Sequence, residues 1–159
     1  MEEIKSETDK KIVFIINPAA ANRRWKKRRR LRAKLIESLP GQCLDAPRSK
    51  EETVAMTKEV CQAADLVVAV GGDGTIADVL QGIFESSRRP EVTFGVIPFG
   101  SGNAFRKSLG LPRHPFKAIK YLKDGDSLTV DLIKIEGRVA GFASVGSTAA
   151  VTGEKIKHG

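Results

Sequence analysis

The stretch that decides the fold runs from residue 65 to residue 84 and reads DLVVAVGGDGTIADVLQGIF. Its first part, 66–70, is a wholly apolar run of strand length, which is typical of a strand buried on both faces of a parallel sheet. Glycines at 71, 72 and 74 then predict a tight turn, and the apolar residues from Ile76 to Phe84 recur at helical spacing. The stretch therefore predicts a strand, a glycine-rich turn and a helix.

The same order of elements recurs on both sides of this unit. Further strands are predicted at 11–17, 42–45 and 92–97. Further helices are predicted at 22–39, 49–64 and 103–109, the second of them opened by a capping box from Ser49 to Glu52. Apolar strands that alternate with helices predict an α/β fold, in which a doubly wound parallel sheet is covered on both faces.

The pattern changes after residue 126. Residues 128–135 and 139–145 are rich in β-branched and apolar side chains and flank Glu136-Gly137, which predicts a β-hairpin. We therefore expect an α/β domain over residues 1–126 and the beginning of a β-rich second domain over 127–159.

The composition excludes several classes of protein. With 41% hydrophobic and 29% charged residues, the 159-residue chain falls in the soluble globular range. Its apolar runs are far shorter than the roughly 18 residues of a membrane-spanning helix, and its first residues lack the order of a secretory signal, so we expect a cytoplasmic protein. Two cysteines without C-x-x-C spacing and two distant histidines predict neither a disulfide framework nor a zinc site.

The positive charge of the chain is concentrated in one segment. The formal net charge is +8, and seven basic residues lie between Arg23 and Arg30, so the remaining chain is close to +1. A solvated helix face, a contact with an anionic membrane and a nucleic-acid or nuclear-targeting patch are all open interpretations of this run.

Three turns are expected at the carboxyl ends of the strands, where doubly wound sheets bind ligands. These turns lie at 17–18, 71–75 and 98–103, and together they would outline one cleft. Glycines in the second turn let backbone N–H groups approach a phosphate at the start of the following helix. The pattern predicts a nucleotide phosphate cradle, although a tight turn without a ligand would use the same glycines.

Asp73 separates this cradle from the common nucleotide motifs. Gly72-x-Gly74-x-x-Ala77 fits the loose dinucleotide pattern, with Glu91 near the expected acidic position, but Asp73 would place a carboxylate beside the pyrophosphate without a lysine to offset it. The chain contains no G-x-x-x-x-G-K-[ST] motif. A carboxylate between phosphate-binding glycines is explained if Mg²⁺ bridges it or if it handles the proton of an acceptor.

Two motifs together, GGDGTIADV at 71–79 and PFGSGNAF at 98–105, resemble the catalytic domain of the diacylglycerol kinase and sphingosine kinase family of lipid kinases. The first motif is shared with NAD kinases and, more distantly, with phosphofructokinases. The second motif, followed by Ser108-Leu109-Gly110, is the one that resembles lipid kinases in particular. The resemblance covers residues 11–150 and implies the sheet topology shared by NAD kinases and diacylglycerol kinases.

The resemblance implies ATP- and Mg²⁺-dependent transfer of the γ-phosphate to a hydroxyl of diacylglycerol, a sphingoid base or a related lipid. It implies that Asp73 is the catalytic residue, either within an acidic and water network around Mg²⁺ or as the base for the acceptor hydroxyl. Asp131 is implied as a second member of the metal network. The nucleotide-contacting residues implied are Asn17, Arg23, Gly72, Gly74, Thr75, Ser101, Gly102 and Asn103.

The chain departs from the family pattern at several positions. Ala104 stands where diacylglycerol-kinase-like members commonly carry an acidic residue and sphingosine-kinase-like members often carry alanine. Asp78 replaces a usual glutamate, and Lys107 replaces a common arginine and loses its bidentate fork. Taken alone, Asp78 and Asp131 read as solvated surface residues, and Asn103 as the N-cap of the helix that follows it.

Family members carry a second β-rich domain that holds the lipid, whereas this chain stops at Gly159. We therefore expect a shortened lipid kinase whose isolated activity is weak or absent and which acts in the cytoplasm or at a membrane surface. The alternative hypothesis is a non-catalytic module that binds a nucleotide or that holds an anionic surface or nucleic acid. An NAD kinase is a third, which the 98–103 turn does not support.

Overall fold

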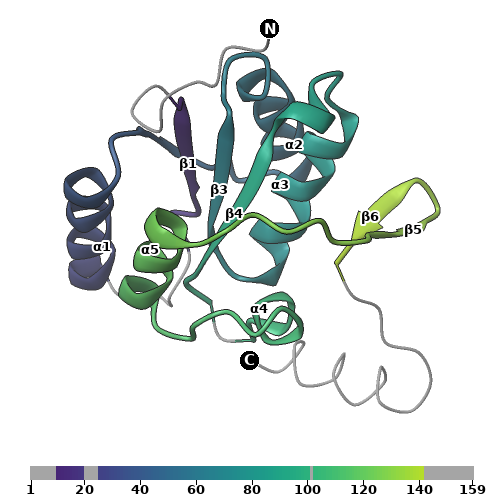
Figure 1. The fold of residues 1–159 in the computed structure, drawn as a ribbon. Coiled ribbons are helices and arrows are strands. Elements are labelled where there is room, and N and C mark those ends of the chain that lie inside the picture. Colours follow the sequence, from purple (N-terminus) through teal and green to yellow (C-terminus); the bar gives the residue numbers. More distant parts are fainter. Residues whose placement is uncertain (1–9, 20–24, 101, 142–159) are drawn as a thin grey trace, which may run out of the picture.

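The computed structural model describes residues 10–19, 25–100 and 102–141. Its centre is a parallel sheet with the strand order β2-β1-β3-β4 (Figure 1). The strands are β1 (Ile12–Ile16), β2 (Gln42–Asp45), β3 (Leu66–Gly71) and β4 (Thr93–Pro98). The predicted α/β fold with a doubly wound parallel sheet is confirmed.

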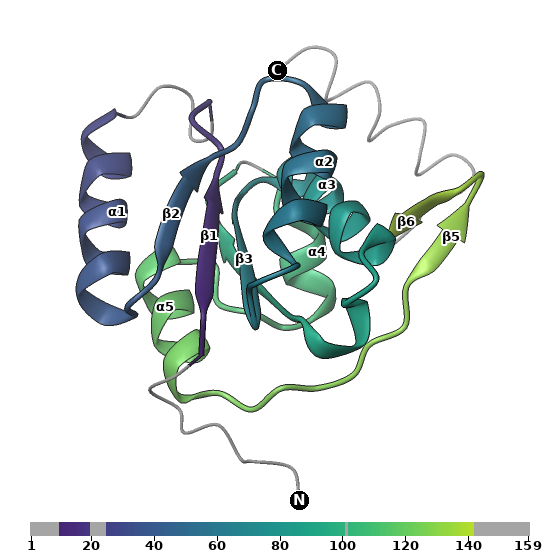
Figure 2. The same cartoon turned by 90° about the horizontal axis from the view of Figure 1, so that it is seen from above.

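Helices cover both faces of this sheet, as the view from above shows (Figure 2). One face carries α1 (Trp25–Ser38) and α5 (Pro115–Asp124), and the other carries α2 (Lys50–Val60) and α3 (Asp73–Glu85). Side chains of β3 alternate between the two layers: Val68 and Val70 pack with α1 and α5, whereas Val67 and Ala69 pack with α3. Burial on both sides explains why these strands are apolar throughout rather than at every second residue.

The register of β3 brings the ends of three strands to one level. Val70 lies opposite Ile16 on one side and Ile97 on the other. Beyond these pairs, the Asn17 N–H donates to the Val70 carbonyl at 3.0 Å, and the Phe99 N–H donates to the Gly71 carbonyl at 2.8 Å. The turns that follow β1, β3 and β4 therefore leave the sheet side by side.

The bounds of the helices show where the sequence signals were sufficient to predict a helix and where they were not. The Ser49 side chain accepts a hydrogen bond from the Glu52 N–H at 3.1 Å and so caps α2, as the capping box predicts. α3 begins at Asp73, two residues before the predicted start at Thr75. α5 was not assigned from the sequence, because its buried stripe of Ala118 and Ile119 is narrow among its lysines. A short helix, α4 (Ala104–Ser108), and a single 3-10 turn, Arg89–Glu91, complete the α/β layers.

The predicted hairpin is present but its strands are short. β5 (Ile133–Ile135) and β6 (Arg138–Ala140) pair antiparallel around Glu136 and Gly137, both of which have positive φ. Residues 128–132 form no strand, and 142–145 lie outside the described residues. The chain between α5 and β5 passes around the β4 edge and places the hairpin beside α3 (Figure 2). The domain boundary at residue 126 stays a prediction.

Gln81 on α3 holds the hairpin. Its Oε1 accepts a hydrogen bond from the Val139 N–H at 2.8 Å, and its Nε2 donates to the Gly137 carbonyl at 3.3 Å. Val139 is buried in the core layer of α2 and α3. The first strands beyond the α/β domain are thus attached to the same helix that follows the glycine-rich turn. In the described ranges, no helix is long and apolar enough to cross a bilayer.

A substitution at Gly82 tests the close packing of α2 against α3. A Cβ on Gly82 would lie 2.5 Å from the Thr57 Cβ and 2.6 Å from the Val54 carbonyl oxygen, so the helices would have to separate. We expect Gly82→Ala to lower the free energy of unfolding by about 1–3 kcal/mol in urea denaturation. Gly74→Ala is the matched control, because a Cβ there meets no atom within 4 Å. Equal losses in both variants would contradict this packing.

Candidate functional site

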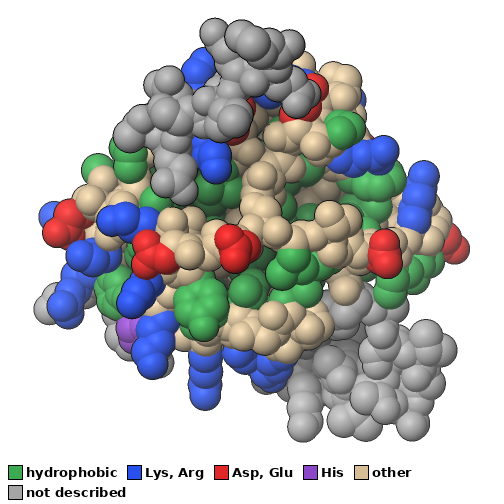
Figure 3. Space-filling view, viewed as in Figure 1, with side chains coloured by type: hydrophobic (Ala, Val, Ile, Leu, Met, Phe, Trp, Pro, Cys, Tyr) green, Lys and Arg blue, Asp and Glu red, His purple; other side chains and the backbone are tan. Residues whose placement is uncertain are grey.

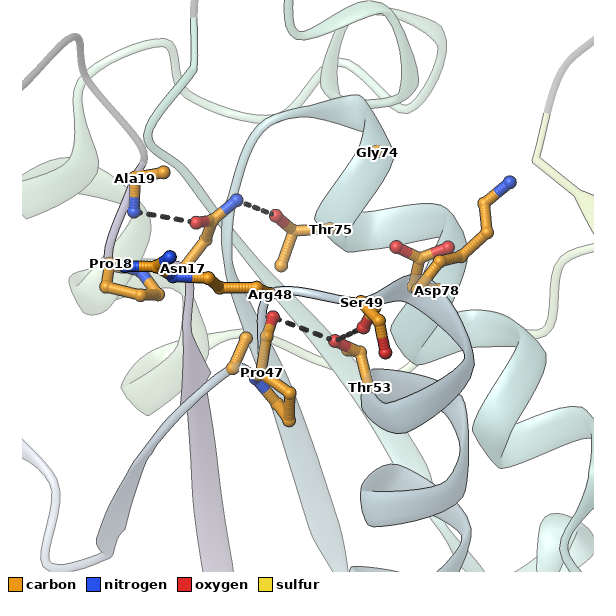
Figure 4. A pocket seen from close by; sticks show the side chains of 12 residues that line it. Asn17, Pro18, Ala19, Pro47, Arg48, Ser49, Thr53, Gly74, Thr75 and Asp78 are labelled. Atoms are coloured by element: carbon orange, nitrogen blue, oxygen red, sulfur yellow. Dashed lines mark hydrogen bonds between the residues drawn. The ribbon is translucent and has the colours of Figure 1, made fainter.

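The turns after β1 and β3 are joined by one side-chain hydrogen bond. The Asn17 Nδ2 donates to the Thr75 Oγ1 at 2.8 Å, and the Asn17 Oδ1 accepts from the Ala19 N–H at 2.8 Å (Figure 4). Thr75 is buried in the first turn of α3. The amide of Asn17 is therefore held in one orientation at the carboxyl end of the sheet.

The turns after β3 and β4 meet through glycines. A Cβ on Gly100 would lie 2.5 Å from the Gly72 Cα, so the two backbones can approach this closely only without a side chain on Gly100. Gly74 differs, because a Cβ there would meet nothing within 4 Å. Gly100 is therefore needed for the close approach of the two turns, whereas the open space at Gly74 leaves its backbone accessible to a ligand.

Asp73 joins the turn after β3 to α4. Its Oδ2 accepts a hydrogen bond from the Ala104 N–H at 3.0 Å, and its Oδ1 accepts from the Phe105 N–H at 3.1 Å. These are amides at the start of α4, which lack partners within the helix. The carboxylate therefore caps α4 from a different element.

The expectation that Asn103 caps this helix was wrong. Asn103 has φ 54° and ψ 44°, in the left-handed region, and its side chain makes no capping bond. Its Nδ2 instead donates to the Gly100 carbonyl at 2.8 Å. Asp73 already satisfies the helix amides from across the turn, and Asn103 stabilises the turn itself.

The other polar atom of the Asn103 side chain is its Oδ1. Among the described residues, its Oδ1 is buried and accepts no hydrogen bond. Buried polar atoms are nearly always paired, so an unpaired oxygen beside the glycine turns marks a position where a cation or a ligand donor would be stabilised. A Cβ on the neighbouring Gly102 would lie 2.9 Å from the Asp73 Oδ2, so the residue before Asn103 lies beside the Asp73 carboxylate.

A pocket of about 870 Å³ lies on the other side of Gly74. Its walls come from the turn after β1, the loop between β2 and α2, and the first turns of α3 (Figure 4). Asn17, Gly74 and Thr75 line it, so two of the three turns expected to outline one cleft contribute to this pocket, whereas no described residue of the 98–103 turn lines it. The volume lies within the usual range for small-molecule sites.

Two cations in this pocket were missed by the sequence analysis. Arg48 lines it from the loop between β2 and α2 and Lys50 from the first residue of α2, on either side of the capping residue Ser49. The available signal was their position directly after a strand of the parallel sheet, at the edge where ligands bind. They give the pocket positive charge opposite the N-terminal turn of α3.

The predicted site residues therefore fall into groups. Asn17, Gly74 and Thr75 face the pocket, whereas Asp73, Gly102 and Asn103 lie together on the α4 side of the glycine turn, where Gly72 meets Gly100. Arg23 and Ser101 lie outside the described residues. Their roles and those of the grouped residues stay predictions.

Asp131 is exposed in the segment before β5. Within the part of the chain that the structure describes, no three His, Cys, Asp or Glu side chains gather at a metal site. The pairing of Asp131 with Asp73 around Mg²⁺ is therefore still a prediction.

Asp78 is the acidic group of the pocket. Partial burial raises the pKa of its carboxyl above the ordinary value of 3.8. The charges of Lys50 and Arg138 oppose this shift, and the charge of Glu51 adds to it. Asp78 thus lies between the pocket and the hairpin that carries Arg138, and it is not the freely solvated residue expected from the sequence alone.

Residues 11–135 match the family model of the diacylglycerol kinase catalytic domain. The chain belongs to the diacylglycerol kinase family. A diacylglycerol kinase of Bacillus subtilis (strain 168) is 36% identical over 89 residues, which are 55% of this chain and 29% of that protein. One of Staphylococcus epidermidis is 43% identical over 74 residues, or 46% of this chain and 23% of that protein. The chain spans less than a third of the length of these curated relatives.

Solved structures resemble this diacylglycerol kinase family domain in fold. The crystal structure of a diacylglycerol kinase from Bacillus anthracis str. Sterne matches with a TM-score of 0.73 at 24% sequence identity. The match covers 82% of this chain and 45% of that chain. The resemblance noted from the two glycine motifs is confirmed by the family match.

Replacement of Asp73 tests its link to α4. In Asp73→Ala the amides of Ala104 and Phe105 lose their acceptors, so we expect their hydrogen exchange, followed by NMR, to accelerate. The free energy of unfolding should fall by about 0.5–2 kcal/mol, as for other lost helix caps. The buried amides of Ala118 and Ile119 in α5 are the internal control, because they should change only with global stability. Unchanged exchange at 104 and 105 would show that the cap is not formed.

The pKa of Asp78 predicts a pH-dependent stability. Because this pKa is higher in the folded chain than in the unfolded chain, the contribution of the carboxyl to stability is complete below the unfolded pKa and is lost as the pH rises through the folded pKa. Asp78→Asn cannot ionise, so its free energy of unfolding relative to the parent chain should increase between about pH 3 and pH 7. Urea denaturation across this range measures the change, with Asp124→Asn at the exposed end of α5 as control. A constant difference at all pH values would refute the prediction.

Proposed function

We propose that this chain is the nucleotide-binding domain of a lipid kinase, which transfers the γ-phosphate of ATP to a hydroxyl of diacylglycerol, a sphingoid base or a related lipid. The observation that carries the proposal is the pocket at the glycine turn, lined by two cations and by the first turns of α3, in a chain of the diacylglycerol kinase family. The transfer of the γ-phosphate and the identity of the lipid substrate are both parts of this proposal.

The pocket supports ATP as the ligand through its charges and its backbone. Gly74 presents accessible backbone at the N-terminal turn of a 13-residue helix, where the helix dipole favours phosphate. Arg48 and Lys50 can offset the phosphate charges from the opposite wall. In this arrangement Asn17 and Thr75, which are hydrogen-bonded to each other, lie between Gly74 and the two cations.

Mg²⁺ fits the α4 side of the turn. Asp73 would hold it, because each carboxylate oxygen keeps acceptor capacity beyond its one backbone N–H, and Asn103 offers an unpaired buried oxygen. When bound, the ion neutralises charge on the transferring phosphoryl group. Asp73 also positions the 98–103 turn through α4, whether it acts at the metal or as the base for the lipid hydroxyl. Asp131 is proposed to join this group.

A contact with the membrane is part of the proposal. The enzyme would be cytoplasmic and peripheral, with the Arg23–Arg30 run facing an anionic surface. Arg29 and Arg30 are exposed on α1, which is consistent with such a contact. Arg23 is proposed to add charge near the phosphates.

One observation favours the non-catalytic alternative. Ala104 provides no side-chain carboxylate at the position where diacylglycerol-kinase-like members often have one, and Asp73 uses both oxygens to cap α4. A module that binds nucleotide without transferring phosphate, and that holds an anionic surface or nucleic acid, would have the same features.

Calorimetric titration with ATP, ADP and NAD, each with and without Mg²⁺, tests the proposal. We expect ATP to bind more tightly with the metal, and Arg48→Gln/Lys50→Gln to weaken its binding by on the order of tenfold or more, because charge-assisted bonds to phosphate are lost. Lys58→Gln, an exposed substitution on α2 outside the pocket, is the matched control. Asp73→Ala should remove the effect of the metal.

Other outcomes would change the assignment. Binding of NAD in preference to ATP would favour an NAD kinase. Absence of nucleotide binding, together with ATP-independent binding of vesicles or DNA, would support a non-catalytic module that holds an anionic surface or nucleic acid, and would contradict the kinase proposal. A pocket variant that binds ATP as tightly as the control would place the nucleotide elsewhere.

A further inference from the structure

We infer that the loop between α4 and α5, with the adjoining side of α5, docks onto an anionic lipid bilayer. We call this the α4–α5 surface and define it by Lys107, Leu109, Arg113, Phe116, Lys117 and Lys120. None of these residues belongs to the Arg23–Arg30 run. The role of this surface rests on the proposed lipid kinase function. Its binding to a bilayer does not require a nucleotide.

The charge of this part of the chain is one-sided. Residues 92–123 contain six Lys and Arg and no Asp or Glu, although 19 acidic residues in 159 would place about four in a stretch of this length. The four cations of the α4–α5 surface are all exposed. None of them forms an ion pair with another described residue. Lys120 lines a groove that also contains Glu37 and Asp124, so the charges of Lys107, Arg113 and Lys117 are the ones most available to an anionic partner.

The loop is held in shape by two hydrogen bonds between Arg106 and Leu111. The Arg106 Nη1 donates to the Leu111 carbonyl, and the Leu111 N–H donates to the Arg106 carbonyl, both at 3.0 Å. Pro115 occupies the first turn of α5, and Ala118 and Ile119 bury the inner side of that helix. Little conformational entropy would be lost when this surface meets a partner.

Apolar side chains among the cations indicate lipid as the partner. Leu109 is 38% exposed and Phe116 is 39% exposed. Exposed leucine and phenylalanine beside lysines are typical of surfaces that lie in the headgroup region of a bilayer. A phosphodiester backbone would use the cations, but it offers nothing to the aliphatic Leu109. We therefore favour a membrane over a nucleic acid.

The position of the surface agrees with this function. α4 follows directly from the 98–103 turn and is capped by Asp73, so the α4–α5 surface begins at the edge of the sheet that carries the site (Figure 1). Lys and Arg side chains gather along the lower edge and lower left of the molecule, where α5 and this loop lie (Figure 3). Docking through it would bring the candidate phosphate site to the headgroups.

Vesicle sedimentation tests the inference with the whole chain. Phosphatidylcholine vesicles with and without about 30% phosphatidylglycerol are compared at low and high salt, because screening weakens contacts between exposed charges. We expect Lys107→Gln/Arg113→Gln/Lys117→Gln to reduce binding to the anionic vesicles on the order of 100-fold at low salt, since each basic residue near such a surface contributes about fivefold. Phe116→Ser should reduce the binding that remains at high salt.

Lys10→Gln/Lys11→Gln/Lys58→Gln is the matched control, with the same loss of charge at exposed positions away from this surface. Equal losses in both triple variants would show a net-charge effect and overturn the inference. A loss of vesicle binding confined to Arg29→Gln/Arg30→Gln would also overturn the inference. DNA binding that depends on the α4–α5 surface, when vesicle binding does not depend on it, would overturn it as well. Circular dichroism confirms that each variant is folded. Because no nucleotide is present, failure here leaves the calorimetric test of ATP binding unaffected, and the converse also holds.

Discussion

The candidate site depends on the pairing of β3 with a strand on each side. Val70 lies opposite both Ile16 and Ile97, so three parallel strands end at one level. Parallel pairing in this register requires a strand that is buried on both faces and flanked by helical crossovers. The pocket, the glycine contact and the cap of α4 all lie at the edge that this register creates. A shift of one residue would separate the turns and exchange the two faces of β3.

Asp73 has a structural role at this edge and is also the proposed catalytic residue. The family resemblance assigns it to catalysis, whereas the geometry shows it capping α4 through Ala104 and Phe105. The two roles are compatible, because a carboxylate has more acceptor positions than these bonds use. A loss of activity on replacing Asp73 would then combine lost chemistry with a displaced turn, and amide exchange in α4 separates the two effects.

One helix carries most of the functional connections. α3 begins with the glycine turn, lines the pocket through Thr75 and Asp78, and holds the hairpin in its middle through Gln81. The charge of Arg138 on the hairpin acts on Asp78. Residues that follow the α/β domain are thus coupled to the pocket through a single rigid element, and the α4–α5 surface is joined to the same helix by the Asp73 cap.

Local patterns in the sequence were sufficient for the elements that depend on local forces. Apolar runs, glycine turns and the Ser49 capping box predicted the sheet and the start of α2, because hydrophobic periodicity and turn chemistry are encoded over a few residues. The two glycine motifs indicated the family through their resemblance to its members. Only the tertiary structure showed that Arg48 and Lys50 line the pocket and that Asp73 rather than Asn103 caps α4. These features are contacts between residues that are distant in the chain. The spacing of residues in the sequence does not determine which side chain contacts a given amide or lines a given cavity.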